Sequence, residues 1–285
     1  MSWVTGHNGV RLHVATAGDP AAPALLLIHG WSQCHLSWTK QLEGPLADRF
    51  FLVAPDLRGH GASDKPDAPE AYDNSAPWAG DIAAIIDQLD LNRPLLVGWS
   101  MGGKVMLDYL AVHGDAALAG VALVGSAVTS GRSQPAEAAA QRGADVAVAA
   151  QGMYSEDLGA NLAATLAFVK ACTAQPVEAD TLAWMMGYNM LCPPHIRAAA
   201  RLRHDDYRDV ARATRAPALV LWGDQDRPMP RALFDESVAC FADPHPVVFE
   251  GIGHSPFWEA PERFDQVLGD FAAAQHRRDT DAIPT

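Results

Sequence analysis

The fold of this chain is decided by the stretch that reads Leu-Leu-Val-Gly-Trp-Ser-Met-Gly-Gly over residues 95–103. Only apolar residues lie between Pro94 and Gly98, which is typical of a short buried parallel strand. The run 104–113 that follows has apolar residues at helical instead of alternating spacing. Ser100 is therefore predicted to lie on a turn between a strand and a helix.

Gly98, Ser100 and Gly102 match the pattern G-x-S-x-G, in which the serine takes a strained backbone conformation and small neighbours let strand and helix approach closely. The turn lifts the hydroxyl out of the sheet and leaves free backbone N–H groups at the start of the helix. Those groups stabilise developing negative charge, so Ser100 is placed as a nucleophile. Short patterns of this kind also arise in plain Gly/Ser-rich turns, but the strand and helix context favours the nucleophile.

The composition is that of a folded protein without long disordered tracts, since 49% of its 285 residues are apolar. This length can hold one large α/β domain with an insertion. With 21 Lys and Arg against 34 Asp and Glu, the formal net charge is −13, which disfavours binding to nucleic acid or to an anionic membrane surface. No signal peptide and no apolar run long enough to span a membrane is recognised, so we expect a cytoplasmic protein.

The cysteines and histidines do not predict a metal site. Cys34, Cys172, Cys192 and Cys240 are widely spaced without a C-x-x-C pair, so we expect free thiols. None of the 11 histidines falls in a His-Glu-x-x-His helix pattern, and most are interpreted as surface or structural residues. We therefore expect neither a catalytic metal nor a cofactor.

Further strands and helices surround the serine turn. An alternating strand over 10–17 is expected to pair with 3–7 across an Asn8-Gly9 turn. More strands are predicted over 24–28, 51–54, 120–125, 218–222 and 247–250. Helices are predicted over 75–91, over 264–271 and over 37–50, the last with a break at Gly44-Pro45. The tail from His276 is predicted to be disordered. The charged loop that follows the strand 51–54 and contains Asp56, Arg58 and His60 is interpreted as a self-bonded turn.

The strand over 24–28 ends in His29-Gly30-Trp31. If it runs parallel to the strand before Ser100, the backbone N–H of Trp31 lies at the same end of the sheet. A second donor to an oxyanion is needed there. The structural alternative is a glycine turn with a packed tryptophan.

From 126 to about 212 the sequence becomes alanine-rich, with helical spacing and breaks at prolines and glycines, which predicts an insertion of several helices. Its Met and aromatic side chains form the insertion's own core, and some are expected to face the main domain as a pocket for apolar ligands. Aromatic side chains near the serine predict a small, apolar, uncharged acyl site. The predicted substrate pocket comprises Trp31, Trp99, Trp184 and Met186.

Serine attack on a carbonyl needs a base that takes the serine proton and a carboxylate that orients this base. His254 and Asp226 supply both, each just past the C-terminal end of a predicted strand, where open α/β sheets place their ligands. Asp224, two residues before Asp226, is a competing acid for the same histidine.

The chain order Ser, Asp, His on strand ends, together with the serine turn, resembles the α/β-hydrolase family over nearly the whole chain. The motifs that carry the likeness are His29–Trp31, Asp56–Ser63, Gly98–Gly103, Gly223–Asp226 and Gly253-His254. They are most similar to Ser-type esterases and cofactor-independent perhydrolases or haloperoxidases of that family. The resemblance implies a mostly parallel central sheet with helices on both faces, a core of residues 1–126 and 213–285, and an inserted helical cap over 127–212.

The resemblance also implies roles for individual residues. It places the acid at the third position after the strand-ending glycine, which is Asp226 and not Asp224. The implied catalytic residues are Ser100 as nucleophile, His254 as general acid and base, and Asp226 as its orienting acid. The implied oxyanion donors are the backbone N–H groups of Trp31 and Met101.

We therefore expect a serine hydrolase that cleaves carboxylic esters or lactones of small, largely apolar substrates through an acyl-enzyme intermediate. Haloalkane dehalogenases and most epoxide hydrolases of this fold carry aspartate in place of Ser100, which disfavours halide or epoxide opening. Perhydrolases tend to carry proline where this chain has Ser32, which favours ester hydrolysis. Perhydrolase or haloperoxidase-like activity, carbon–carbon bond hydrolysis and a non-catalytic ligand receptor remain alternatives, and a homo-oligomer is compatible with the sequence.

Overall fold

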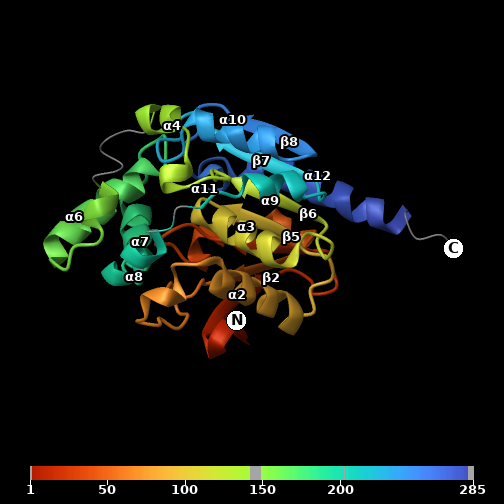
Figure 1. Ribbon diagram of the computed structural model, residues 1–285, viewed down its shortest axis with the longest axis horizontal. Coiled ribbons are helices and arrows are strands. Elements are labelled where there is room, and N and C mark those ends of the chain that lie inside the picture. Colours follow the sequence, from red (N-terminus) through yellow and green to blue (C-terminus); the bar gives the residue numbers. More distant parts are fainter. Residues whose placement is uncertain (1, 142–148, 202, 204, 282–285) are drawn as a thin grey trace.

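A computed structural model describes residues 2–141, 149–201, 203 and 205–281. Its centre is an eight-stranded sheet in the order β1-β2-β4-β3-β5-β6-β7-β8 (Figure 1). The strands are β1 (Ser2–Thr5), β2 (Arg11–Ala17), β3 (Ala24–Ile28), β4 (Phe51–Pro55), β5 (Leu95–Trp99), β6 (Gly120–Val124), β7 (Ala218–Gly223) and β8 (Pro244–Phe249). Neighbouring strands from β4 to β8 are parallel, whereas β1 and β2 run antiparallel to their neighbours. The predicted mostly parallel α/β sheet is confirmed.

The N-terminal hairpin closes at the predicted turn. Strand β1 runs antiparallel to β2, with Thr5 opposite Arg11. In the connecting turn Asn8 and Gly9 have φ of 57° and 78°, the left-handed region that these two residue types reach at low cost. The hairpin makes β1 one edge of the sheet.

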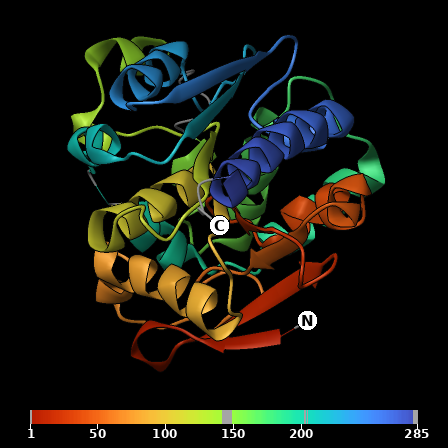
Figure 2. The same ribbon diagram turned by 90° about the vertical axis from the view of Figure 1, so that its right-hand side faces the viewer.

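Helices cover both faces of the sheet, with α2 and α3 on one face and α12 on the other (Figure 2). The α-helices are α1 (Thr39–Leu42), α2 (Ser75–Gln88), α3 (Met101–His113), α4 (Ala136–Gln141), α6 (Leu158–Ala171), α7 (Ala179–Asn189), α8 (Pro194–Arg201), α9 (Arg208–Ala213), α10 (Arg231–Cys240), α11 (Pro256–Glu259) and α12 (Pro261–Asp281). Short 3-10 helices, His35–Trp38 and Pro45–Asp48, flank α1. The predicted break at Gly44-Pro45 is therefore present.

Alternate residues of the buried strands pack on opposite faces of the sheet. In β3, Leu26 belongs to the apolar cluster that contains Ile82 of α2, whereas Leu25 belongs to the cluster that contains Phe264 of α12. All four side chains are fully buried. A strand buried on both faces must be apolar throughout, which explains why β3 and β5 read as unbroken apolar runs.

The described chain between β6 and β7 contains the predicted helices. Helices α4 and α9, near the two ends of this segment, pack against α10. Helices α6 and α7 pack against each other and project with α8 from one end of the molecule (Figure 1). An isolated β-bridge between Thr129 and Asp206 joins the two ends of the segment. That residues 127–212 form a separate cap stays a prediction.

Several boundaries differ from the predictions, and two of the differences have a physical reason. Strand β8 begins at Pro244, before the predicted start at 247, and contains two prolines. Because β8 is an outer strand, these prolines do not remove an N–H that a further strand would need. Helix α12 continues to Asp281, so the disordered tail from His276 is wrong for residues 276–281, because extending an existing helix costs less than starting one.

No helix in the described ranges combines the length and the apolar character needed to cross a membrane. Cys34, Cys172, Cys192 and Cys240 are all buried and free, as the sequence predicts.

Candidate active site

Ser100 lies on the turn between β5 and α3, with φ of 53° and ψ of −116°. A residue other than glycine adopts such a conformation at a cost of about 1–3 kcal/mol, and strain of this kind concentrates at functional sites. The Ser100 N–H donates to the carbonyl oxygen of Val124 at 2.9 Å, which anchors the turn to the end of β6. Ser100 thus stands at the carboxyl ends of the parallel strands and lines a cavity there.

The glycines of the serine motif allow this turn because α3 packs directly on the strands. A β-carbon on Gly98 would lie 2.5 Å from the Cα of Gly103, and one on Gly102 would lie 2.2 Å from the carbonyl oxygen of Ile28. Both distances are far shorter than van der Waals contact. Any side chain at either position would push α3 away from β3 and β5.

The chain that follows β3 lies beside the serine turn. Strands β3 and β5 are parallel neighbours in register, so residues 29–31 run level with the turn. A β-carbon on Gly30 would lie 3.3 Å from the Cβ of Ser100. Met101 is the first residue of α3, where backbone N–H groups lack partners within the helix. The structure therefore brings the backbones of Trp31 and Met101 close to Ser100.

His254 and Asp226 meet at the ends of β8 and β7. The Nδ1 atom of His254 lies 2.7 Å from Oδ2 of Asp226, and both side chains are buried. The other carboxylate oxygen, Oδ1, accepts the N–H of Met229 at 2.6 Å. The indole N–H of Trp99 donates to the carbonyl oxygen of His254 at 2.9 Å. These bonds fix the imidazole and leave its Nε2 atom for another partner.

Asp224 contacts different groups. Its Oδ1 atom accepts the backbone N–H of Gly251 at 2.7 Å and the side-chain amide of Gln225 at 3.2 Å. The residue is exposed, whereas Asp226 is buried. Asp224 therefore ties the turn after β7 to the turn after β8, and Asp226 is the acid that contacts the histidine.

A cavity of about 210 Å³ opens at the serine turn, and Trp31, Ser100, Met101 and His254 all line it. The structure thus brings these four sequence-predicted residues to one place, with Asp226 bonded to His254 behind the wall. Sites for drug-sized ligands enclose roughly 300–1,000 Å³. The cavity suits a smaller molecule.

The other predicted pocket residues lie elsewhere. Trp99 packs edge-on against Phe257 beneath the histidine. Trp184 is 37% exposed and packs against Trp258, and Met186 joins a small cluster between α7, α6 and the chain after β3. None of the three is among the described residues that line the cavity. Helix α7 turns Trp184 and Met186 toward its own neighbours, so these three side chains lie outside the cavity at Ser100, and their part in a substrate pocket stays a prediction.

Further side chains complete the cavity wall. They include apolar Phe168, Met229 and Leu233, and charged Lys104, Arg201, Arg203 and Asp205. The cavity as a whole is therefore charged in part, and the uncharged acyl site stays a prediction. Runs of charge usually lie on solvated faces, and no spacing in the sequence indicates which of them approach the serine.

The predicted bonding within the loop after β4 is present in part, since Oδ2 of Asp56 accepts the N–H of Ala62 at 2.8 Å, but Arg58 bonds outside the loop to α2. The Arg58 guanidinium forms an ion pair with Asp81 at 2.7 Å, and both side chains are almost fully buried. The His60 ring Nδ1 lies 2.9 Å from the carbonyl oxygen of Arg58. Burial lowers the pKa of His60 to about 3, so this imidazole is neutral and structural at physiological pH.

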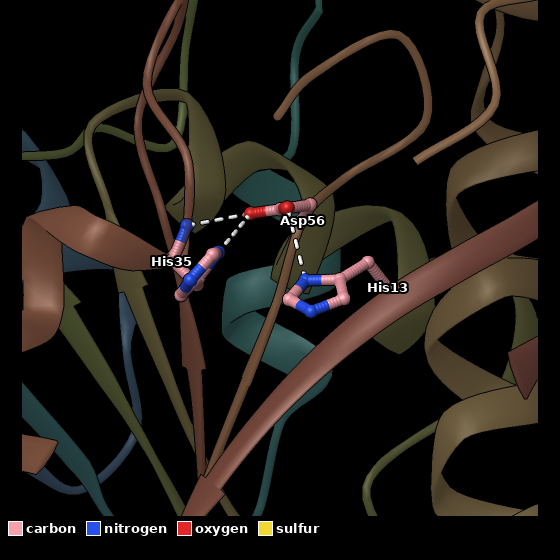
Figure 3. Close-up of side chains that lie close together, drawn as sticks. All are labelled: His13, His35 and Asp56. Carbon is pink, nitrogen blue, oxygen red and sulfur yellow. Dashed lines mark hydrogen bonds and ion pairs between the residues drawn. The ribbon is translucent and has the colours of Figure 1, made fainter. Parts of the chain in front are cut away.

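In the part of the chain that is described, one group of side chains has the composition of a metal site. It consists of His13, His35 and Asp56 (Figure 3). Each imidazole Nδ1 already lies within hydrogen-bond distance of the carboxylate, at 3.1 Å for His13 and 2.7 Å for His35. Burial opposes ionisation of Asp56, but the bonds from His35 outweigh it and hold the pKa of the carboxyl well below its usual range. The carboxylate thus ties β2 and the chain after β3 to the end of β4 through hydrogen bonds.

The comparison with protein families agrees with this architecture. The model of the alpha/beta hydrolase fold matches residues 23–261. The chain belongs to the alpha/beta hydrolase fold family. The resemblance and the fold class inferred from the sequence are confirmed.

Solved esterases have the same architecture as this alpha/beta hydrolase. A putative aryl esterase from Burkholderia cenocepacia is 31% identical, with a TM-score of 0.90 over 97% of this chain and 99% of that chain. Esterase RhEst1 from Rhodococcus sp. ECU1013 is 33% identical, with a TM-score of 0.89 over 96% of this chain and 98% of that chain. Epoxide hydrolase A of Mycobacterium tuberculosis is 35% identical over 131 residues, which span 46% of this chain and only 40% of that relative.

Proposed function

We propose that this alpha/beta hydrolase is a serine hydrolase that cleaves carboxylic esters or lactones of small substrates through an acyl-enzyme intermediate. One observation carries the proposal: strained Ser100 and His254, itself bonded to Asp226, line the same cavity. The two esterases with nearly complete overlap support ester bonds as the target.

In the first half-reaction the Ser100 hydroxyl oxygen attacks the ester carbonyl carbon while Nε2 of His254 takes the hydroxyl proton. The carbonyl electrons move onto oxygen, where the N–H groups of Trp31 and Met101 donate to the oxyanion. Asp226 stabilises the imidazolium that forms. The intermediate then expels the alcohol oxygen, which takes the proton from His254, and the acyl group stays on Ser100.

In the second half-reaction water replaces the alcohol. His254 takes a proton from water, the hydroxide oxygen attacks the acyl carbon, and the serine oxygen leaves with the proton that His254 returns. The acid product and the free serine result. In a lactone the alcohol and acid belong to one molecule, so the same steps open the ring.

Epoxide hydrolysis is the second candidate, because a sequence relative carries that name. Attack of Ser100 on an epoxide carbon would open the ring and leave an alkyl ether on the serine. An ether has no carbonyl carbon for water to attack, so the enzyme would stop after one event. The residue at position 100 therefore favours esters. Perhydrolysis, cofactor-free halide oxidation and carbon–carbon hydrolysis use the same three residues and are distinguished by substrate.

The test is hydrolysis of 4-nitrophenyl butyrate. The same protein is then assayed for hydrolysis of a panel of lactones and of an epoxide, and for peracid formation. Ser100→Ala should lower kcat by at least roughly 10³-fold, since only binding and the oxyanion donors would remain. Ser126→Ala is the matched control: this neighbouring serine donates to the Ser100 carbonyl oxygen at 2.7 Å, and losing one hydrogen bond should cost about tenfold or less.

A serine-directed phosphonate should label Ser100 in the wild type. A folded Ser100→Ala variant that keeps more than a few per cent of the activity, or phosphonate attached elsewhere, would refute the assignment. A wild type that binds esters without hydrolysing them would instead support a ligand receptor.

A further inference from the structure

The cavity beside Ser100 carries more positive than negative side chains, although the protein as a whole is acidic. The basic side chains that line it are Lys104, Arg201 and Arg203. Among the described lining residues, Asp205 is the only one that carries a carboxylate. The chain contains 21 basic and 34 acidic residues, so this local excess of cations runs against the composition. Cations in a concave site act on a ligand at short range, where salt screens them least.

Arg203 and Asp205 already neutralise each other within the wall. The Nε atom of Arg203 lies 3.1 Å from Oδ1 of Asp205, and its two Nη atoms lie 2.8 and 2.6 Å from the carboxylate oxygens of Asp108. The hydroxyl of Ser130 lies 3.2 Å from Oδ2 of Asp205. Asp205 is therefore engaged by its own partners instead of by Arg201.

Arg201 lines the cavity next to Trp31. Its guanidinium lies over the indole ring of Trp31, 5.0 Å from the ring centroid. A guanidinium that stacks by its flat face on an aromatic ring keeps its in-plane N–H donors for other partners. Among the described residues no carboxylate forms an ion pair with Arg201, and the residue is exposed. Its edge can therefore bind the two oxygens of a ligand carboxylate.

Helix α8 holds Arg201 in this place through the residue one turn earlier. Arg197 is fully buried, and its carbonyl oxygen accepts the indole N–H of Trp31 at 2.9 Å. Its guanidinium donates to the Asn161 side chain at 2.8 Å and to the Asn189 carbonyl at 2.6 Å. Residues four apart share one helix face, so Trp31 contacts both arginines. Arg201 is thereby fixed on the wall that Trp31 forms beside the serine.

We propose that the cavity accepts esters that carry a second, ionised carboxyl group, and that Arg201 pairs with that carboxylate. The inference rests on the proposed esterase function and names its substrate class. With the ester carbonyl at Ser100, the small cavity places the second carboxylate only a few bonds away. A neutral ester of the same length enters the same cavity without the ion pair, which makes Arg201 a specificity-determining residue.

The experiment compares substrates that differ in one group. 4-Nitrophenyl valerate and the mono-4-nitrophenyl ester of glutaric acid share leaving group and acyl length, and differ in a terminal methyl or carboxylate. 4-Carboxyphenyl valerate carries the carboxylate on the leaving group instead. Arg201→Gln should lower kcat/KM about tenfold for at least one carboxylate ester and less than about twofold for 4-nitrophenyl valerate.

Two further variants control for charge and place. Arg201→Lys keeps the positive charge without the planar guanidinium, and it should retain part of the preference for the carboxylate esters over 4-nitrophenyl valerate. Arg215→Gln removes the same charge from an exposed site outside the cavity and should leave the substrate ratios unchanged. Equal losses on neutral and carboxylate esters, or no loss on either carboxylate ester, would overturn the proposal.

Failure of the esterase function would be seen separately, as absent turnover of 4-nitrophenyl valerate by the wild type. Calorimetric binding of glutarate then decides the inference, because it needs no turnover. Binding that Arg201→Gln weakens about tenfold supports the carboxylate site. Equal binding to the two proteins, or none to the wild type, overturns it.

Discussion

Gly125 leaves no room for a side chain beside His254: a β-carbon on its backbone would lie 2.9 Å from the Nδ1 atom of the imidazole. The same atom would lie 3.2 Å from Oδ2 of Asp226. Gly125 directly follows β6 and has φ of 50°. The end of β6 therefore closes against the hydrogen bond between His254 and Asp226.

Gly125→Ala should displace the imidazole and its acid and lower kcat by about 100-fold, since small misplacements of catalytic groups are costly. Gly251→Ala is the matched control, because Gly251 also has positive φ, 73°, but no atom lies within 4 Å of its β-carbon position. Both variants carry backbone strain, and only the first disturbs the histidine. Ester hydrolysis and thermal melts of the two proteins check this, and equal kcat values would contradict it.

Asp226→Asn should lower kcat by roughly 10⁴-fold if the carboxylate holds the imidazole in the required tautomer. Asp224→Asn should keep most of the activity, because its carboxylate bonds the Gly251 N–H instead of the histidine, and it should cost about 1 kcal/mol of stability or less. The measurement is kcat of both folded variants on one ester. A larger loss at position 224 would move the acid to that residue.

Phe168 is expected to set substrate size in place of Trp184. Phe168 lines the cavity and packs edge-on against Trp31, with ring centroids 5.2 Å apart. Phe168→Leu should therefore shift the ratio of kcat/KM between long and short acyl esters about tenfold, the worth of a methylene or two. Trp184→Leu, outside the cavity, should leave that ratio unchanged. An equal shift in both variants would show that the cavity extends into α7.

Acid should destabilise the fold through two buried histidines. Burial lowers the pKa of His29 to about 4 and that of His60 to about 3, against about 6.5 in an unfolded chain. The unfolded state binds more protons below that value, so stability is full above about pH 6.5 and is lost as pH falls toward the folded pKa. At pH 5 each histidine should lower the free energy of unfolding by about 2 kcal/mol.

Urea unfolding at pH 7 and pH 5 checks this contribution by difference, since other groups affect the wild type and its variants alike. Between pH 7 and pH 5, the free energy of unfolding of His60→Gln should fall by about 2 kcal/mol less than that of the wild type. His195→Gln, at an exposed histidine, should follow the wild type. An unchanged pH dependence in His60→Gln would show that this imidazole is not kept neutral by burial.

Features that depend on neighbouring residues could be predicted from the sequence alone. The serine turn followed from Gly98 and Gly102, because only glycine lets α3 approach the strands. The hairpin followed from Asn8-Gly9, because these residues reach positive φ cheaply. Parallel buried strands read as apolar runs, and their shared direction brought the ends that carry His254 and Asp226 to one edge of the sheet.

The wall of the cavity depends on contacts between residues that are far apart in the chain. Helical spacing identifies which face of a helix is apolar, but not which element that face meets, so Trp184 and Met186 were expected at the serine and instead pack with their own neighbours. Phe168 and Arg201 come from helices that are placed by contacts with Trp31, far away in the chain. The charge of the cavity is set by such long-range packing, which no local pattern encodes.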